Sequence, residues 1–284
     1  MVLESLTSAK MAEKRPIELL PLGFLFGSIA IFLSLWVFPS NSSLAMVFFT
    51  VMAALPLMMH VIGLEKEKEE CCHSEMEALH AHEKALPFFV FIFLGLLLAY
   101  SVWFVVLPTD TVSHLFSAQT HTIKQINVYI SGSSIGPGHL TAILSNNIKV
   151  LTFCVLFSFI YGAGAIFILT WNASVIGAAV GNTVREVLSK IAVASGLGSA
   201  AGYFHAFSLG LLRYLVHGIP EILGYFFGGL AGGMISVAMV KHEFGSEKFT
   251  MTMRDALALI LVAAICLVLA AVLEVGVTPM IPIR

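Results

Sequence analysis

The segment HGIPEILGYFFGGLAGGMISVAMV, residues 217–240, combines the two features that decide the fold of this chain. Residues 218–240 form an apolar run, and a transmembrane helix needs about 20 predominantly apolar residues. The run starts beside His217 and Glu221, and no further charge follows until Lys241. Because ionisable groups are costly within a bilayer, this pair indicates either a functional site or a buried structural pair.

The composition of the whole chain indicates a membrane protein. Of its 284 residues, 58% are hydrophobic and 11% are charged, whereas a soluble domain carries roughly 25% charged residues. We therefore predict an all-α, multi-pass helix bundle of the cell membrane, in contact with the lipid bilayer. The net charge of −2 at pH 7 argues against nucleic acid as a partner.

Six segments meet the length requirement for a crossing, namely residues 19–38, 44–64, 87–107, 148–170, 218–240 and 256–275. Lysines and arginines are concentrated before the first segment, between the second and third, and before the last, which predicts a cytoplasmic N-terminus and an external C-terminus. That orientation requires an odd number of crossings, so we expect about seven, one of them from the polar residues 172–216. The glycines of residues 196–202 also predict a broken or re-entrant helix there, since irregular backbone at membrane depth must be buried or line a cavity.

The hydropathy pattern divides the chain into four parts. We expect a cytoplasmic segment, residues 1–18, and then a three-span part, residues 19–107, with a charged inner excursion at 65–86. Residues 108–147 form an outer loop, and residues 148–284 form the C-terminal transmembrane part. Apolar residues of the outer loop recur at roughly helical spacing and predict an amphipathic helix on the membrane or on the bundle: Val112, Phe116, Ile123, Ile126 and Ile130.

His217 and Glu221 lie four residues apart, so a helix places them on one face. We expect this helix to begin near Gly218, with Pro220 in its first turn, where the missing N–H costs nothing. The pair could be a structural lock, which with Arg213 holds the helix entry in place, or it could bind an ion, a metal or a proton. We favour the structural lock.

Other polar residues of the C-terminal part extend these alternatives. Either they line one intramembrane pocket with His217 and Glu221, or they cap and join helices. These residues are His205, Arg213, Asn172 and Asn182. No His-Glu-x-x-His pattern includes Glu221, and no nucleophile–base pair stands out, so we do not expect an enzyme.

The charged excursion carries residues that bind borderline metals. On a helix, Cys71, Glu75 and His82 share a face, and their thiolate, carboxylate and imidazole groups can hold zinc or a similar divalent metal. The chain has no Cys-x-x-Cys pattern, however. We therefore favour a solvated charged hairpin over a metal site.

Glycines form a stripe along residues 218–240. Gly224, Gly228 and Gly232 recur every four residues, and such small-residue faces let helix backbones approach closely. The stripe could pack within the chain or form a homodimer. We favour internal packing.

The C-terminal half resembles the stage II sporulation protein M family, over about residues 145–275. The resemblance is carried by a polar pair, a long apolar helix and the His-Gly-Ile-Pro-Glu element; the matching positions are Asn146, Asn147, Asn172, His217, Gly218 and Glu221. It implies a membrane scaffold for protein partners, because founding members work with peptidoglycan-remodelling partners during spore engulfment. It transfers no catalytic residue. The polar intramembrane residues instead favour a transporter or a channel, so both functions stay open.

Overall fold

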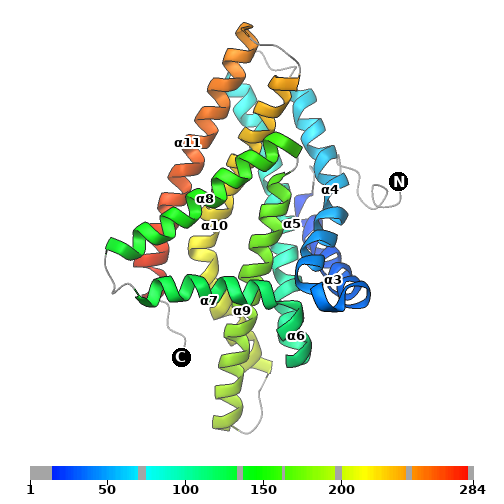
Figure 1. Ribbon diagram of the computed structural model, residues 1–284, viewed down its shortest axis with the longest axis vertical. Helices are drawn as coiled ribbons and strands as arrows, with labels where there is room; N and C mark the ends of the chain where they lie inside the picture. Colours follow the sequence, from blue (N-terminus) through cyan, green and yellow to red (C-terminus); the bar gives the residue numbers. More distant parts are fainter. Residues whose placement is uncertain are drawn as a thin grey trace. The chain divides into compact units, whose positions relative to one another are not determined.

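The computed structural model describes residues 15–69, 75–132, 137–161, 164–195, 200–240 and 245–280. Every regular element in this part of the chain is a helix (Figure 1). The elements are η1 (Pro16–Glu18), α3 (Leu19–Val37), η2 (Pro39–Asn41), α4 (Ser42–Glu69), α5 (Glu75–Val106), α6 (Thr109–Leu115), α7 (Ser117–Gly132), α8 (Pro137–Tyr161), α9 (Gly164–Ser195), α10 (Ala200–Val240), α11 (Glu247–Gly276) and η3 (Thr278–Met280).

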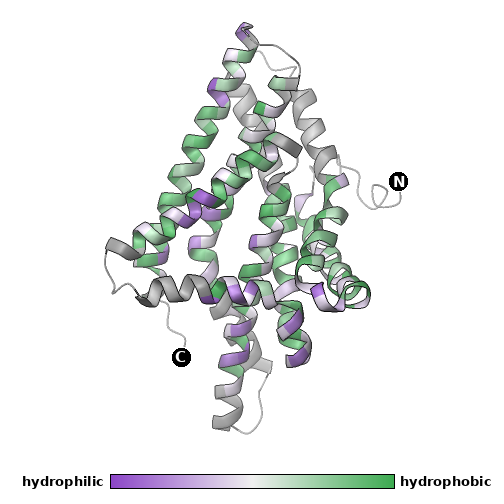
Figure 2. Cartoon of the chain, viewed as in Figure 1, coloured by the Kyte–Doolittle hydropathy of each residue, from purple (hydrophilic) through white to green (hydrophobic). Residues whose placement is uncertain are grey.

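Among the described residues, seven helical stretches are long and apolar enough to cross a membrane. These candidate spans are Pro16–Val37, Pro39–Leu57, Pro87–Val106, Leu140–Phe159, Ile166–Ser189, Tyr214–Ser236 and Phe249–Gly276. Figure 2 shows the pattern on α11, which is hydrophobic along most of its length and hydrophilic near its N-terminal end. The prediction of an all-α membrane protein with seven crossings is confirmed.

The span predicted at residues 148–170 exists but has the wrong bounds, since the candidate span of α8 is Leu140–Phe159. In the structure α8 ends at Tyr161 and α9 begins at Gly164, so this apolar run belongs to two helices. Hydropathy does not register the change of helix, because the residues on both sides of it are apolar. The seventh crossing therefore comes from α9, whose candidate span begins before the polar region, at Ile166.

The helix that carries His217 and Glu221 is also longer than predicted. We expected it to begin near Gly218, but α10 is already helical from Ala200, and Pro220 lies well inside it. Proline is tolerated inside a membrane helix because neighbouring groups can satisfy the freed backbone. Residues 196–199, which include part of the stretch where we expected a break, lie outside the described residues.

The predicted outer loop is largely helical. It contains α6, α7 and the first part of α8, which already begins at Pro137. Val112 and Phe116 are buried, and the Phe116 ring packs against Phe104 with its centroid 5.0 Å away. The apolar side chains of this first stretch therefore cover protein.

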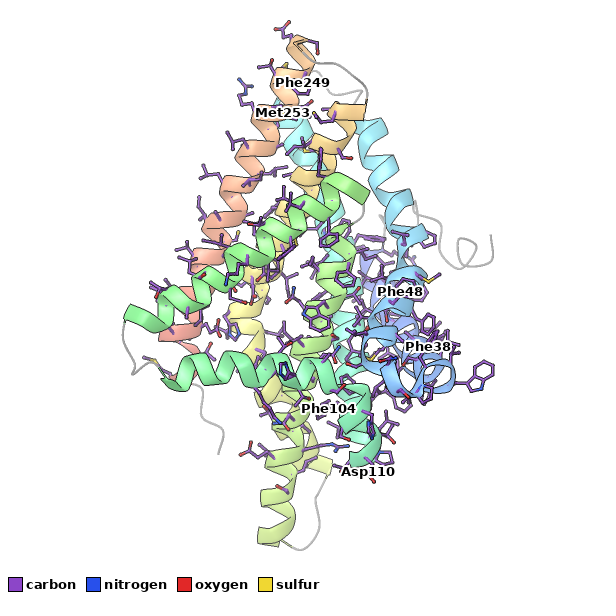
Figure 3. All side chains as sticks on the ribbon, in the orientation of Figure 1. Phe38, Phe48, Phe104, Asp110, Phe249 and Met253 are labelled. Atoms are coloured by element: carbon purple, nitrogen blue, oxygen red, sulfur yellow. The ribbon has the colours of Figure 1, made fainter. Side chains whose placement is uncertain are left out.

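The chain folds into two compact units, and the first comprises residues 1–118 and 170–177. In this unit α3 crosses α5 where Gly23 and Gly95 face each other, and a Cβ on either glycine would collide with backbone of the opposite helix. The buried Tyr100 hydroxyl lies 2.8 Å from the Thr50 hydroxyl. Phe38 and Phe48 are about half exposed on the outside of the unit (Figure 3), as suits contact with lipid.

The second unit comprises residues 119–169 and 178–284, and its centre is α10 packed against α8 and α11 (Figure 1). Gly224 faces Leu267 of α11, whereas Gly228 and Gly232 face α8. The glycine stripe thus packs within the chain, the alternative that we favoured. A homodimer stays a prediction.

Candidate polar site between α8, α10 and α11

The site starts from two residues one helical turn apart on α10. The Tyr225 hydroxyl donates a hydrogen bond to Glu221 Oε1 over 2.7 Å. Tyr225 is only 1% exposed, and Glu221 is half-buried. Because residues four apart share a helix face, both side chains are directed toward the same neighbouring helices.

The second element is Asn147 on α8. Its Oδ1 lies 3.4 Å from the Tyr225 hydroxyl, and the residue is 3% exposed. Its Nδ2 is buried and has no hydrogen-bond partner among the described residues. A buried amide group without a partner costs about 1–3 kcal/mol, so this atom calls for an explanation.

The third element is Glu274 on α11, which is half-buried and within electrostatic range of both Glu221 and Tyr225. The Cys154 thiol of α8 is also within range of Tyr225 and belongs to the same buried cluster. The site therefore gathers two carboxyl groups, a phenol, an amide and a thiol inside candidate spans. Such groups can bind a cation, a hydrogen-bonding solute or a proton.

His217 lies next to this site but has a different connection. Its Nδ1 is 3.0 Å from the Thr278 hydroxyl, and the residue is 8% exposed. The Thr278 hydroxyl is placed to donate to the Leu273 carbonyl over 3.3 Å, which leaves its oxygen to accept from His217 Nδ1–H. This contact between His217 and Thr278 therefore connects α10 to η3, the short helix that follows α11.

The family comparison agrees with this architecture. The model of the family described as stage II sporulation protein M matches residues 85–279. The chain belongs to the stage II sporulation protein M family. The match begins just before candidate span Pro87–Val106 and includes all the residues of the polar site, so it extends further toward the N-terminus than the resemblance predicted. No curated protein and no solved structure matches the chain significantly.

The other residues predicted for the pocket differ in their unit and in their exposure to the surface. Asn172 is half-buried and lies in the first unit, whereas Glu221 lies in the second. Asn182 belongs to the second unit and is exposed on α9. The side chains of His205 and Arg213 lie outside the described part of the structure. A pocket that includes these four residues stays a prediction.

The predicted metal site falls in a part of the chain whose side chains are not described. Cys71 lies outside the described residues, and so do the side chains of Glu75 and His82, which belong to α5. Where the structure does describe side chains, no group of three or more His, Cys, Asp or Glu residues could hold a metal ion. Zinc binding stays a prediction that elemental analysis of the purified protein would test.

Three residues of the site and its surroundings were missed in the sequence. Glu274 could have been identified from the sequence, because it is the single charged residue between Asp255 and Arg284. The evidence for Tyr225 in the sequence was weaker, namely its position four residues after Glu221 on the same helix face. Nothing in the sequence pointed to Thr278, because its partner His217 is 61 residues away in the chain.

We expect Thr278→Val to destabilise the protein by about 1–3 kcal/mol, because it removes a partner of the buried His217 ring. Valine keeps the shape of threonine and loses only the hydroxyl. Thr278→Ser, which retains the hydroxyl, is the matched control. The melting temperature in detergent measures both, and equal values for Thr278→Val and wild type would contradict the assignment.

Proposed function

We propose that this member of the family is a non-enzymatic membrane protein of the transporter or channel type, which moves a small polar solute or ion past the site on α8, α10 and α11. The observation that carries the proposal is the polar site inside candidate spans, where Tyr225 joins Asn147 of α8 to Glu221 of α10 and a second carboxyl group, Glu274 of α11, lies within electrostatic range of Glu221. Ionisable residues in such positions mark ion and substrate pathways in many membrane proteins.

The chemistry of the pair supports this proposal over a purely structural one. A structural polar contact joins a donor to an acceptor or a positive to a negative group. Two ionised carboxyl groups within electrostatic range of each other are both acceptors, so they do not stabilise a fold in this way. They suit a site whose partner comes from outside the protein.

The second candidate is a scaffold that assembles partner proteins. It is supported by the hydrogen bond between His217 and Thr278 and by the glycine stripe, both of which hold α10 in place within the chain. In a scaffold, the polar residues contribute only to the fold and the outer surfaces recruit partners. The two functions differ in whether the purified protein moves a solute.

Flux through liposomes tests the proposal. The purified protein is reconstituted, and the flux of protons, Na⁺, K⁺ and a small neutral solute is compared with that of protein-free liposomes. We expect flux of at least one of them, and at least about a tenfold loss in Glu221→Gln, equivalent to about 1.4 kcal/mol. Glutamine keeps the acceptor of the Tyr225 hydrogen bond, so the fold is retained. Wild-type flux equal to the protein-free value for every probe would favour the scaffold.

We also propose that the N-terminus lies in the cytoplasm and the C-terminus outside. It is supported by the positions of the lysines and arginines and by the odd number of candidate spans among the described residues. We expect Lys241→Cys to react with a membrane-impermeant maleimide from the cytoplasmic side alone. Labelling from the outer side would contradict the orientation.

A further inference from the structure

Tyr225 connects two polar residues on different helices. Its hydroxyl lies 2.7 Å from Glu221 Oε1 on its own helix and 3.4 Å from Asn147 Oδ1 on α8. Tyr225 and Asn147 are both buried. Buried polar groups are held in place by their hydrogen-bond partners, so this hydroxyl is a fixed point beside the carboxyl group of Glu221.

Packing also fixes the ring of Tyr225. The ring belongs to a buried cluster with residues of α8 and α11, which include Leu151, Cys154, Ala263 and Leu267. On the next turn of α10, a Cβ at Gly228 would collide with the Leu151 side chain, so α8 lies directly against α10 there. Side chains in close-packed surroundings keep one rotamer. Three helices therefore set the position of the Tyr225 hydroxyl.

The two carboxyl oxygens of Glu221 have different surroundings. Oε1 accepts the hydrogen bond from Tyr225, whereas Oε2 has no hydrogen-bond partner among the described residues. The buried side-chain atoms without a partner in this part of the chain are Ser42 Oγ, Asn147 Nδ2 and Thr170 Oγ1, and Glu221 Oε2 is not among them. Because Glu221 is half-buried, Oε2 is the oxygen that a molecule from outside the protein can reach.

Building on the proposed transport function, we propose that Tyr225 is a positioning residue, which holds Glu221 through Oε1 and thereby directs Oε2 toward the transported solute. A glutamate side chain is flexible, and holding it in its binding geometry lowers the entropy cost of binding a solute. This contact forms whether or not Glu221 is charged, because carboxyl oxygens accept hydrogen bonds in both protonation states. Glu221 contacts the solute, and Tyr225 acts through Glu221.

Tyr225→Phe tests the assignment, because it removes the hydroxyl and keeps the ring in its cluster. We expect the flux of any solute that the wild type moves to fall at least about tenfold, since a small misplacement of a binding group is costly. The infrared band of the Glu221 carboxyl group, identified as the band lost in Glu221→Gln, is expected to shift, since a hydrogen bond weakens the C–O bond of its acceptor. The matched control is Tyr100→Phe in the first unit, which removes the hydroxyl next to Thr50 and keeps both the band and the flux.

A second variant tests the same contact from the side of Glu221. Glu221→Asp keeps the carboxyl group but shortens the side chain by a methylene, which withdraws the group from the Tyr225 hydroxyl. We expect the same loss of flux as in Tyr225→Phe. The double variant should be no worse than either single one, because both remove one contact. This arm decides the proposal even where Tyr225→Phe fails to fold.

The outcomes separate a positioning role from a role in the fold. Wild-type flux in Tyr225→Phe or in Glu221→Asp overturns the proposal. A loss of flux that follows a loss of Tm, with an unshifted Glu221 band, also overturns it and leaves Tyr225 a structural residue. The infrared band does not depend on flux. A shifted band in a protein that moves no solute therefore rejects transport and keeps the orientation of Glu221 by Tyr225.

Discussion

Glu274→Gln is expected to lower solute flux at least about tenfold while the protein folds as stably as wild type or more stably. The physical reason is that Glu274 lies within electrostatic range of Glu221 in a region of low dielectric constant, where two charged carboxyl groups interact unfavourably. The amide has nearly the same shape and removes this interaction, so we expect Tm to stay constant or rise. The same change removes a charge that the transported species needs.

This combination separates a functional residue from a structural one. When a residue that only supports the fold is replaced, the protein loses stability, and its activity falls in proportion. Glu247→Gln is the control, since Glu247 lies exposed in the first turn of the same helix. The double variant Glu221→Gln/Glu274→Gln should be no worse than either single one if the two act as a unit. A strong loss of Tm with retained flux in Glu274→Gln would refute the assignment.

Gly232→Ala is expected to destabilise the protein by about 1–3 kcal/mol, and Gly232→Leu by more, because both overpack the contact between α10 and α8. A Cβ at Gly232 would collide with the Val155 carbonyl oxygen and would lie 2.9 Å from Ser158 Cβ. Backbone cannot rotate away as a flexible side chain can, so the helices must separate. Tm in detergent measures the loss.

The sign of this effect is informative, because replacing glycine by alanine inside a helix normally stabilises by about 1 kcal/mol. Gly276→Ala is the control: it lies at the end of α11, where a Cβ would meet nothing within 4 Å. We expect that variant to be at least as stable as wild type. If Gly232→Ala were equally stable, the close packing of α8 on the stripe would be disproved.

Errors in the sequence prediction trace to particular residues. The continuous apolarity of residues 148–170 concealed the change from α8 to α9, because hydropathy measures burial in lipid and not backbone direction. Pro220 suggested a helix start, yet α10 continues through it from Ala200. Both errors arose where a local signal was overridden by packing.

The sequence predicted only part of the candidate site, because local patterns do not show how helices pack. Glu221 was evident as an intramembrane charge, and His217 as its neighbour on the same face. Their hydrogen-bond partners in the structure, Tyr225 and Thr278, were not evident, because a pattern along one helix does not identify the helices that pack against it. His217 and Glu221, which the spacing joined into one pair, in fact have different hydrogen-bond partners.

Apolar length, charge content and the short element at residues 217–221 are local properties, so they were enough to predict an all-α, multi-pass membrane protein of this family. Which polar groups come together depends on how the helices pack. Asn147 and Tyr225 are 78 residues apart in the chain, and Glu274 comes from a third helix. The glycine face of α10 lets α8 and α11 approach closely, and that packing brings the three residues to one site.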